Sequence, residues 1–294
     1  MKFIESIAID KDAWLRLTQQ NSVHLFSEIT YLDAVAENWG AYVKGNYEAA
    51  IVIPYRMKFS MKWVYIPLFY RASEWIGTWS DEEKNQVLAK LQKEFNAGEL
   101  SIEDENDEQY FYQSISSNAE FQSDYNKLAH RMLKKAMNSP LTLTNEFHEE
   151  AFMRLIVSEL SQKVTVWNEV GKSVFMKLIR NYQDGDRMKF YGTILHGDLV
   201  GGIVVLESDS RNLYLKGTAT VEAKKMGAMY LLMDTAIQDA LKKKCTFDFG
   251  GSRVDGVARF NQNLGGINVH YRVIKWDNFP YWFIVLKRIK NKWK

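Results

Sequence analysis

The chain of 294 residues contains a single cysteine, Cys245, which excludes a disulfide within the chain and is typical of a reducing compartment. Histidines are also few, and the five present are scattered through the sequence without the spacing of a zinc site. They are His24, His130, His148, His196 and His270. We therefore expect no metal site.

Long apolar runs are absent as well. The longest, YWFIVL near the C-terminus, is far shorter than the roughly 20 residues that a membrane-spanning helix needs. The first residues, MKFIESIAID, lack the apolar core of a signal peptide. We expect a cytoplasmic protein without a membrane span. The motifs of zinc proteases, P-loop proteins and α/β-hydrolases (H-E-x-x-H, G-x-x-x-x-G-K-S/T and G-x-S-x-G) are also absent, which argues against those classes.

The residues that are present indicate a globular protein with a large core. Hydrophobic residues make up 46%, charged residues 25% and aromatic residues 14% of the chain. The charges are unevenly spread, because residues 139–294 carry 23 Lys and Arg against 16 Asp and Glu, whereas residues 1–138 carry 15 against 20. A basic second half is consistent with binding an anion, although ordinary variation in solvated faces would also produce it.

Hydrophobic periodicity predicts an α/β protein with the same element order in both halves. In the first half we expect a helix over 12–20 and a second over 28–40, where Gly40 is placed to stop it. A strand, turn and strand over 42–54, a strand over 62–69, a helix over 81–95 and a strand over 99–106 follow. In the second half we expect helices over 145–161 and 171–183, a hairpin over 188–208 with its turn at 196–198, a strand over 212–220 and a helix over 227–244. A strand over 246–251, a short helix that begins at residue 256 and ends at 265–266, and strands over 270–276 and 281–289 follow. Residues 128–140 are expected to connect two domains, 1–138 and 139–294.

Two segments contain candidate site residues. The first, FDFGGSRVDGVARFNQNLGG from Phe247 to Gly266, contains five of the 17 glycines and places polar side chains after a strand, where α/β sheets keep their sites. The candidates here are Asp248, Gly251, Ser252, Arg253 and Arg259. The alternative is that the glycines serve only the backbone angles of a tight strand–helix connection.

The second segment, EAKKMGAMYLL, lies where a strand is followed by a helix. Free N–H groups at a helix start favour anions, and Lys224, Lys225 and Gly227 are the residues placed to meet a phosphate. The alternative is a pair of solvated lysines before an ordinary helix.

The order of hairpin, strand, glycine-marked helix and strand resembles a GNAT acyltransferase domain. Two such domains in tandem, together with the pattern F-D-F-G-G followed by G-V-A-R-F and L-G-G, resemble the FemAB group. The segments SEITYLDAVAENWG and IVIPYRMKFSMKWVYIPLF are similar to that group's N-terminal helix and first hairpin. The resemblance implies two GNAT-like domains, each a mixed, mostly antiparallel sheet flanked by helices, with the second domain binding the donor.

The resemblance also implies an N-acyltransferase that transfers an aminoacyl or acyl group to an amine, with a cell-wall (peptidoglycan) precursor as a possible acceptor. No cofactor would be permanently bound; the donor substrate would be aminoacyl-tRNA or acyl-CoA. Met229 departs from the small residue that ends the GNAT phosphate pattern R/Q-x-x-G-x-G/A, which slightly favours the tRNA.

Under this interpretation Lys224, Lys225, Gly227, Gly251, Ser252 and Arg253 bind the donor, and Asp248 and Arg259 are the catalytic candidates. Tyr70 and Arg71 are the acceptor-binding candidates, because they follow the YIPLF strand. Two alternatives stay open: an acyl-CoA-dependent acetyltransferase acting on a small amine, and a non-catalytic binding protein on the same fold.

Overall fold

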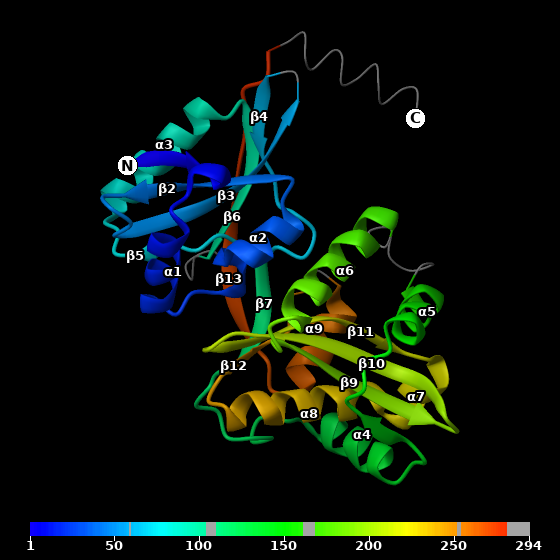
Figure 1. The fold of residues 1–294 in the computed structure, drawn as a ribbon. Coiled ribbons are helices and arrows are strands. Elements are labelled where there is room, and N and C mark those ends of the chain that lie inside the picture. The colour runs from blue at the N-terminus through cyan, green and yellow to red at the C-terminus, as the bar shows by residue number, and fades with distance from the viewer. Residues whose placement is uncertain (59, 104–109, 161–167, 252–253, 281–294) are drawn as a thin grey trace. The chain divides into compact units, whose positions relative to one another are not determined.

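The computed structural model describes residues 1–294 except 59, 104–109, 161–167, 252–253 and 281–294. Contacts divide the described residues into two compact units. The first unit takes its residues from Met1–Asp107 and from Tyr271 onward, and the second unit comprises those within Glu108–His270. Figure 1 labels the helices and strands of both.

The first unit contains a mostly antiparallel sheet with the strand order β1-β2-β3-β4-β6-β13, and β5 pairs with β3. The bounds are β1 Lys2–Glu5, β2 Asn38–Lys44, β3 Ala49–Lys58, β4 Met61–Val64, β5 Ile76–Gly77, β6 Ala97–Glu103 and β13 Ile267–Asp277. Of these pairs, β4 and β6 run parallel. Two parallel neighbours need a crossover connection from the end of one strand to the start of the next, and a helix lies in this connection.

That connecting helix is α3, Asp81–Glu94. Ser80 forms a capping box with Glu83 at its start, and the fully buried Val87 and Leu91 pack into the core of the sheet. The other helices of this unit are α1 Lys11–Gln20, α2 Ile29–Val35 and the short 3₁₀ turns η1 Ser6–Ala8 and η2 Leu25–Ser27.

The second unit repeats this arrangement. Its strands follow in the order β8-β9-β10-β11-β12-β7, with β11 and β12 parallel and the other neighbours antiparallel. The bounds are β7 Tyr110–Ile115, β8 Thr142–Thr144, β9 Met188–Leu195, β10 Asp198–Glu207, β11 Arg211–Ala219 and β12 Thr246–Asp248. The predicted turn of the β9–β10 hairpin is confirmed at His196 and Gly197, both with positive φ.

Helices cover both faces of this second sheet (Figure 1). They are α4 Lys127–Met137, α5 Glu149–Leu160, α6 Glu169–Gln183, α7 Val221–Met226, α8 Ala228–Lys242 and α9 Asp255–Asn263. Helix α8 buries Leu232, Met233 and Ile237 in the core on one face and also contacts α4, whereas α5 and α6 cover the other face. The short helix α7 follows β11, and α8 begins directly after it at Gly227, so the α7–α8 junction lies just beyond the end of β11.

The two units divide the chain at positions other than the predicted boundary at residue 138. Residues 128–140, expected to be a connector, form most of α4, which packs against α7 and α8 of the second unit. Strand β7 follows β6 in the chain but pairs with β12, and the segment Tyr271–Asp277 of β13 pairs with β6 of the first unit. Each unit is therefore completed by a strand from a distant part of the sequence.

Some element ends differ from the sequence-based predictions. Helix α2 ends at Val35, and Gly40 lies inside β2 rather than stopping the helix. A Cβ at Gly40 would lie 2.5 Å from the Phe3 ring, so β1 packing requires the glycine. Pro54 lies within β3 rather than at its end. The strand predicted over 281–289 lies outside the described residues.

Candidate functional site

The second unit contains a strand pair that separates along its length. Strands β11 and β12 pair only from Arg211 to Leu213, opposite Thr246 to Asp248. From Tyr214 to Ala219, β11 keeps its pairing with β10, but no described strand pairs with its other edge. Such an edge presents backbone N–H and C=O groups in a row to any ligand that enters beside it.

The glycine turn after β12 lies against the start of this free edge. Gly250 has a φ of 78°, and a Cβ there would lie 2.4 Å from the carbonyl oxygen of Tyr214. Gly251 also has a positive φ and is exposed. The glycines therefore have a backbone reason to be present, and the turn that they form borders the opening between the strands. Ser252 and Arg253 lie outside the described residues.

Asp248, the predicted catalytic carboxylate, is fully buried at the end of β12. Its Oδ1 accepts a hydrogen bond of 2.8 Å from the backbone N–H of Gly250, and its Oδ2 lies 3.3 Å from Arg211 Nη1. These contacts anchor the glycine turn to β11. The structure thus assigns Asp248 an evident structural role, and its catalytic role stays a prediction.

Arg259 lies on α9 with its side chain exposed, and it makes no ion pair or hydrogen bond with the described residues. Its neighbour Phe260 is half-buried and packs edge to face on Tyr230 of α8, with ring centroids 4.8 Å apart. Asn263 Nδ2 donates to the Tyr230 hydroxyl at 3.1 Å. These contacts hold α9 beside the first turn of α8, so Arg259 and the predicted phosphate turn lie on adjacent elements.

The predicted phosphate turn is the junction of α7 and α8. Gly227 ends α7 and begins α8 with a φ of 96°, a conformation that favours glycine. A Cβ at Gly227 would lie 2.4 Å from the carbonyl oxygen of Met132 in α4. Close packing of α4 therefore accounts for the glycine without a phosphate, and donor binding at Gly227 remains a prediction.

The two lysines of this junction differ in their surroundings. Lys224 Nζ lies 3.2 Å from Glu159 Oε2 of α5 and 3.3 Å from the Thr218 hydroxyl of β11. Lys225 is exposed and has no partner among the described residues. Of the pair, Lys225 has its ammonium available to an anion, whereas Lys224 would first have to leave Glu159.

Sequence reasoning missed Lys216. This residue lies on the free-edge part of β11, opposite Val204, where an irregularity between Val204 and Val205 shifts the register. Lys216 and Thr218 are two residues apart and so share a face of the sheet, the one that also carries the Lys224–Glu159 pair. Burial lowers the pKa of the Lys216 ammonium below the ordinary lysine value.

The predicted acceptor residues, Tyr70 and Arg71, belong to the first unit and are both buried, each 6% exposed. The Tyr70 hydroxyl is hydrogen-bonded to Ser73 Oγ at 3.0 Å, and burial raises the pKa of the phenol. Arg71 Nη2 contacts His24 Nε2 at 3.1 Å and Glu103 Oε1 at 3.4 Å. Both side chains therefore have hydrogen-bond or ion-pair partners inside the first unit, and acceptor binding by them stays a prediction.

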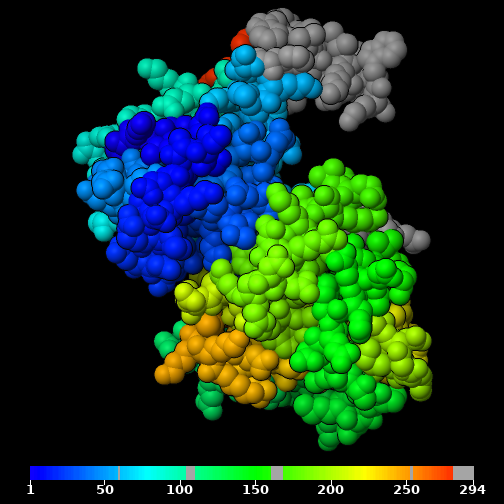
Figure 2. All heavy atoms as spheres, in the orientation of Figure 1, coloured from blue at the N-terminus to red at the C-terminus, as the bar shows by residue number. Residues whose placement is uncertain are grey.

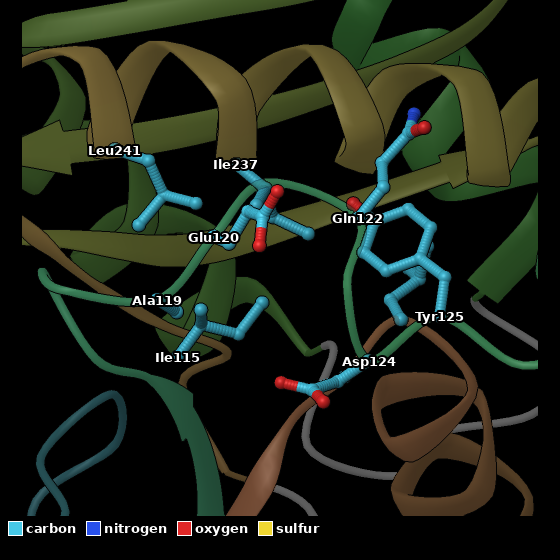
Figure 3. A pocket seen from close by; sticks show the side chains of 10 residues that line it. Ile115, Ala119, Glu120, Gln122, Asp124, Tyr125, Ile237 and Leu241 are labelled. Carbon is cyan, nitrogen blue, oxygen red and sulfur yellow. The ribbon is translucent and has the colours of Figure 1, made fainter.

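A small hollow also lies in the second unit, under the loop before α4 (Figure 3). Ile237 and Leu241 point into it from α8, opposite the loop residues Ala119 and Glu120. Its volume of about 10 Å³ has room for about one water molecule. We therefore interpret it as a packing gap rather than a substrate site.

A protein-family model matches a large part of the second unit. Residues 129–260 match the family model described as an acetyltransferase (GNAT) domain. The match begins in α4 and ends in α9, so it includes the divergent β11–β12 pair and the α7–α8 junction. A search of curated proteins finds no match.

Solved structures extend the likeness to the whole chain. FemX superposes with a TM-score of 0.65 at 10% identity, covering 92% of this chain and 95% of FemX. L-PGS from Bacillus licheniformis gives a TM-score of 0.57 at 11% identity, covering 96% of each chain. A tandem GNAT protein from the clavulanic acid biosynthesis pathway gives 0.54 at 12% identity, covering 95% of this chain and 99% of that one.

The chain therefore has a tandem GNAT fold. More particularly, it is similar in fold to FemX, and the sequence-based prediction of a FemAB-like fold is confirmed. Among the described helices, none is both long and apolar enough to cross a membrane.

Proposed function

We propose that this protein is an N-acyltransferase of the FemAB-like type, which transfers an aminoacyl or acyl group to an amine. The observation that carries the proposal is the separation of β11 from β12 beyond Leu213, beside the start of α8. An activated carbonyl that enters there can accept hydrogen bonds from backbone N–H groups of β11. The helix start nearby favours the negative charge of a phosphate-bearing donor.

The reaction needs positioning and proton transfer more than covalent catalysis. The neutral amine attacks the carbonyl carbon, the oxyanion forms against the β11 edge, and the bond to the leaving oxygen or sulfur breaks. One proton leaves the amine, and one reaches the leaving group. Lys216 is the residue that we assign to this proton transfer, because burial lowers its pKa and its position on the free part of β11 is suitable.

The donor is an aminoacyl-tRNA or an acyl-CoA. The GNAT family match favours acyl-CoA, whereas the FemX-like fold and Met229, in place of a small residue, favour aminoacyl-tRNA. Lys225, the start of α8 and Arg259 are the phosphate and carbonyl contacts that we propose for either donor, together with Gly251, Ser252 and Arg253 of the turn.

For the acceptor we propose an amine of a cell-wall precursor in the cytoplasm, with Tyr70 and Arg71 contributing to its binding. Their burial implies that they would act by shaping the first unit or after a local rearrangement.

A donor screen tests the proposal. The full chain is mixed with acetyl-CoA, longer acyl-CoAs or total aminoacylated tRNA, and its melting temperature is measured, because a ligand of the folded state stabilises it. We expect one donor class to raise the melting temperature and to transfer its labelled acyl group to an amine acceptor. A donor that binds without any transfer would instead indicate a non-catalytic binding protein, and a chain stabilised by none of them would contradict the proposal.

Arg259→Lys is expected to lower turnover about tenfold or more while leaving the melting temperature unchanged. The guanidinium can make a two-pronged contact with a phosphate or carboxylate, which a lysine does not reproduce, and such a contact contributes about 1.5–3 kcal/mol. No described residue depends on Arg259 for an ion pair. Arg154→Lys on α5, an exposed arginine paired with Glu150, is the control. Unchanged turnover with a lowered melting temperature would remove Arg259 from the site.

A further inference from the structure

Helix α4 presents a stripe of cations. Lys127, Arg131, Lys134 and Lys135 are spaced so that they fall on one side of the helix, and all four are exposed. The stripe spans about 12 Å at the rise of an α-helix. Figure 2 shows α4 on the outside of the second unit, in green at its lower edge.

Few carboxylates flank this stripe in the sequence. The segment from Tyr125 to Asn145 contains these four cations and no Asp or Glu, and Asp124, three residues before Lys127, forms no ion pair with it among the described contacts. None of the four forms an ion pair with a described residue. By contrast, Lys172 of α6 and Lys242 of α8 each form an ion pair with an acidic residue three positions away. The α4 stripe therefore presents uncompensated positive charge.

A groove of about 290 Å³ opens beside the stripe. It is lined by Gln122, His130, Leu133, Lys134, Met137 and Asn138, without a carboxylate. The carboxylate of Asp234 is hydrogen-bonded to one lining residue, because it accepts a 2.8 Å hydrogen bond from Gln122 Nε2. Asp234 is buried, however, and forms no ion pair with any of the four exposed cations. The groove thus adds hydrogen-bond donors next to Lys134 and widens the surface that is complementary to an anion.

We propose that this α4 surface, defined by Lys127, Arg131, Lys134 and Lys135, binds the sugar-phosphate backbone of a structured RNA. The inference rests on the proposed function, in that an aminoacyl-tRNA donor would bring such an RNA to the second unit. α4 also contacts α7 and α8, whose junction carries Lys225, so the stripe lies on elements continuous with the proposed donor site. A row of cations tracks successive phosphates and displaces their counterions, which gives affinity without reading sequence.

The packing of α4 favours RNA over a lipid surface. An interfacial helix inserts a continuous apolar face between lipids. In α4 the apolar residues Ala129, Leu133 and Ala136 are buried in the protein, and the exposed Leu128 and Met137 lie on opposite sides of the helix, so they form no such face. The cationic face is thus left to a solvated polyanion.

The test measures binding of a fluorescein-labelled RNA hairpin with a single-stranded 3′ end by fluorescence anisotropy, over a series of salt concentrations. The variant Lys127→Gln, Arg131→Gln, Lys134→Gln, Lys135→Gln is compared with the full chain and with a control of equal charge change. The control, Arg154→Gln, Lys172→Gln, Lys189→Gln, Lys242→Gln, removes four cations that are paired elsewhere in the same unit.

We expect the α4 variant to lose at least about tenfold in affinity at low salt. The slope of log affinity against log salt concentration should become less negative by about one for each phosphate contact removed. The control variant should bind the hairpin as the parent chain does. Binding to anionic phosphatidylglycerol vesicles is measured alongside, and none is expected.

Three results would overturn the proposal. If the hairpin binds both variants equally, the RNA lies elsewhere, and the proposed function stands without this surface. If the chain binds the vesicles and not the hairpin, α4 is a membrane-facing surface. If neither binds while an acyl-CoA is transferred to an amine, the enzyme uses no RNA and the acyltransferase proposal survives alone.

Discussion

Lys216→Met is expected to lower the turnover of acyl transfer by about 100-fold or more while the chain stays folded. A residue that moves a proton in the transition state typically contributes a factor of 10²–10⁴. Lys216 lies on the free part of β11, and burial already favours the neutral amine that such a residue needs. Methionine has a similar length and no charge to bury, so we expect the variant to fold.

The dependence of turnover on pH distinguishes two roles for Lys216: transfer of a proton, or electrostatic attraction of the oxyanion. A base must be neutral to accept a proton, so turnover should rise with pH through the lowered pKa of Lys216. Lys216→Arg keeps the charge but does not deprotonate, and it should lose that dependence together with activity. If Lys216 only attracts the oxyanion, the arginine variant should keep most of the turnover.

The matched control is Lys189→Met, another lysine on a strand of the same sheet, which pairs with the exposed Asp186. We expect that variant to transfer at the parent rate. Equal turnover of the Lys216→Met variant, the control and the parent would remove Lys216 from the mechanism.

The sequence predicted those parts of the fold that depend on local pattern. The periodic apolar face of α8, the hairpin turn at His196 and Gly197, and the short helix after the glycine turn are confirmed. Each is fixed by contacts between residues close in sequence or by glycine's access to positive φ.

The parts that were missed depend on contacts between distant residues. Strand β7 pairs with β12 about 130 residues further along the chain, and no periodicity within Tyr110–Ile115 specifies that partner. Likewise Gly40 resembled a helix stop in sequence, whereas its role is to admit the Phe3 ring against β2.

The candidate site was predicted only in part for the same reason. The glycine turn and Lys224–Lys225 were visible as motifs, but the ion pair of Lys224 with Glu159 joins helices that are 65 residues apart. Lys216 reads as one of several polar residues in a mixed strand. Its importance depends on the separation of β11 from β12 and on the irregular register at Val204, and both are properties of the folded sheet.

Asp248→Ala is expected to destabilise the protein by about 3 kcal/mol. Removing one partner of a buried pair leaves the other charge uncompensated and typically costs about 3–5 kcal/mol. We expect the lower end, because the Arg211 side chain is 24% exposed and water can partly replace the carboxylate. The Gly250 N–H would also lose its acceptor. For a unit of this size, the melting temperature should fall by roughly 6–12 °C.

Asp248→Asn distinguishes the anchoring role from the proton transfer that the sequence suggested. The amide oxygen can still accept the Gly250 N–H, whereas its NH₂ group cannot pair with Arg211. We therefore expect a smaller loss of stability and nearly normal turnover per folded molecule. The control is Glu150→Ala, which removes an exposed partner of Arg154 and should cost at most about 1 kcal/mol. An Asp248→Asn protein with the parent melting temperature and turnover reduced by orders of magnitude would make Asp248 a catalytic residue, because anchoring alone cannot lower the rate of a fully folded enzyme to that extent.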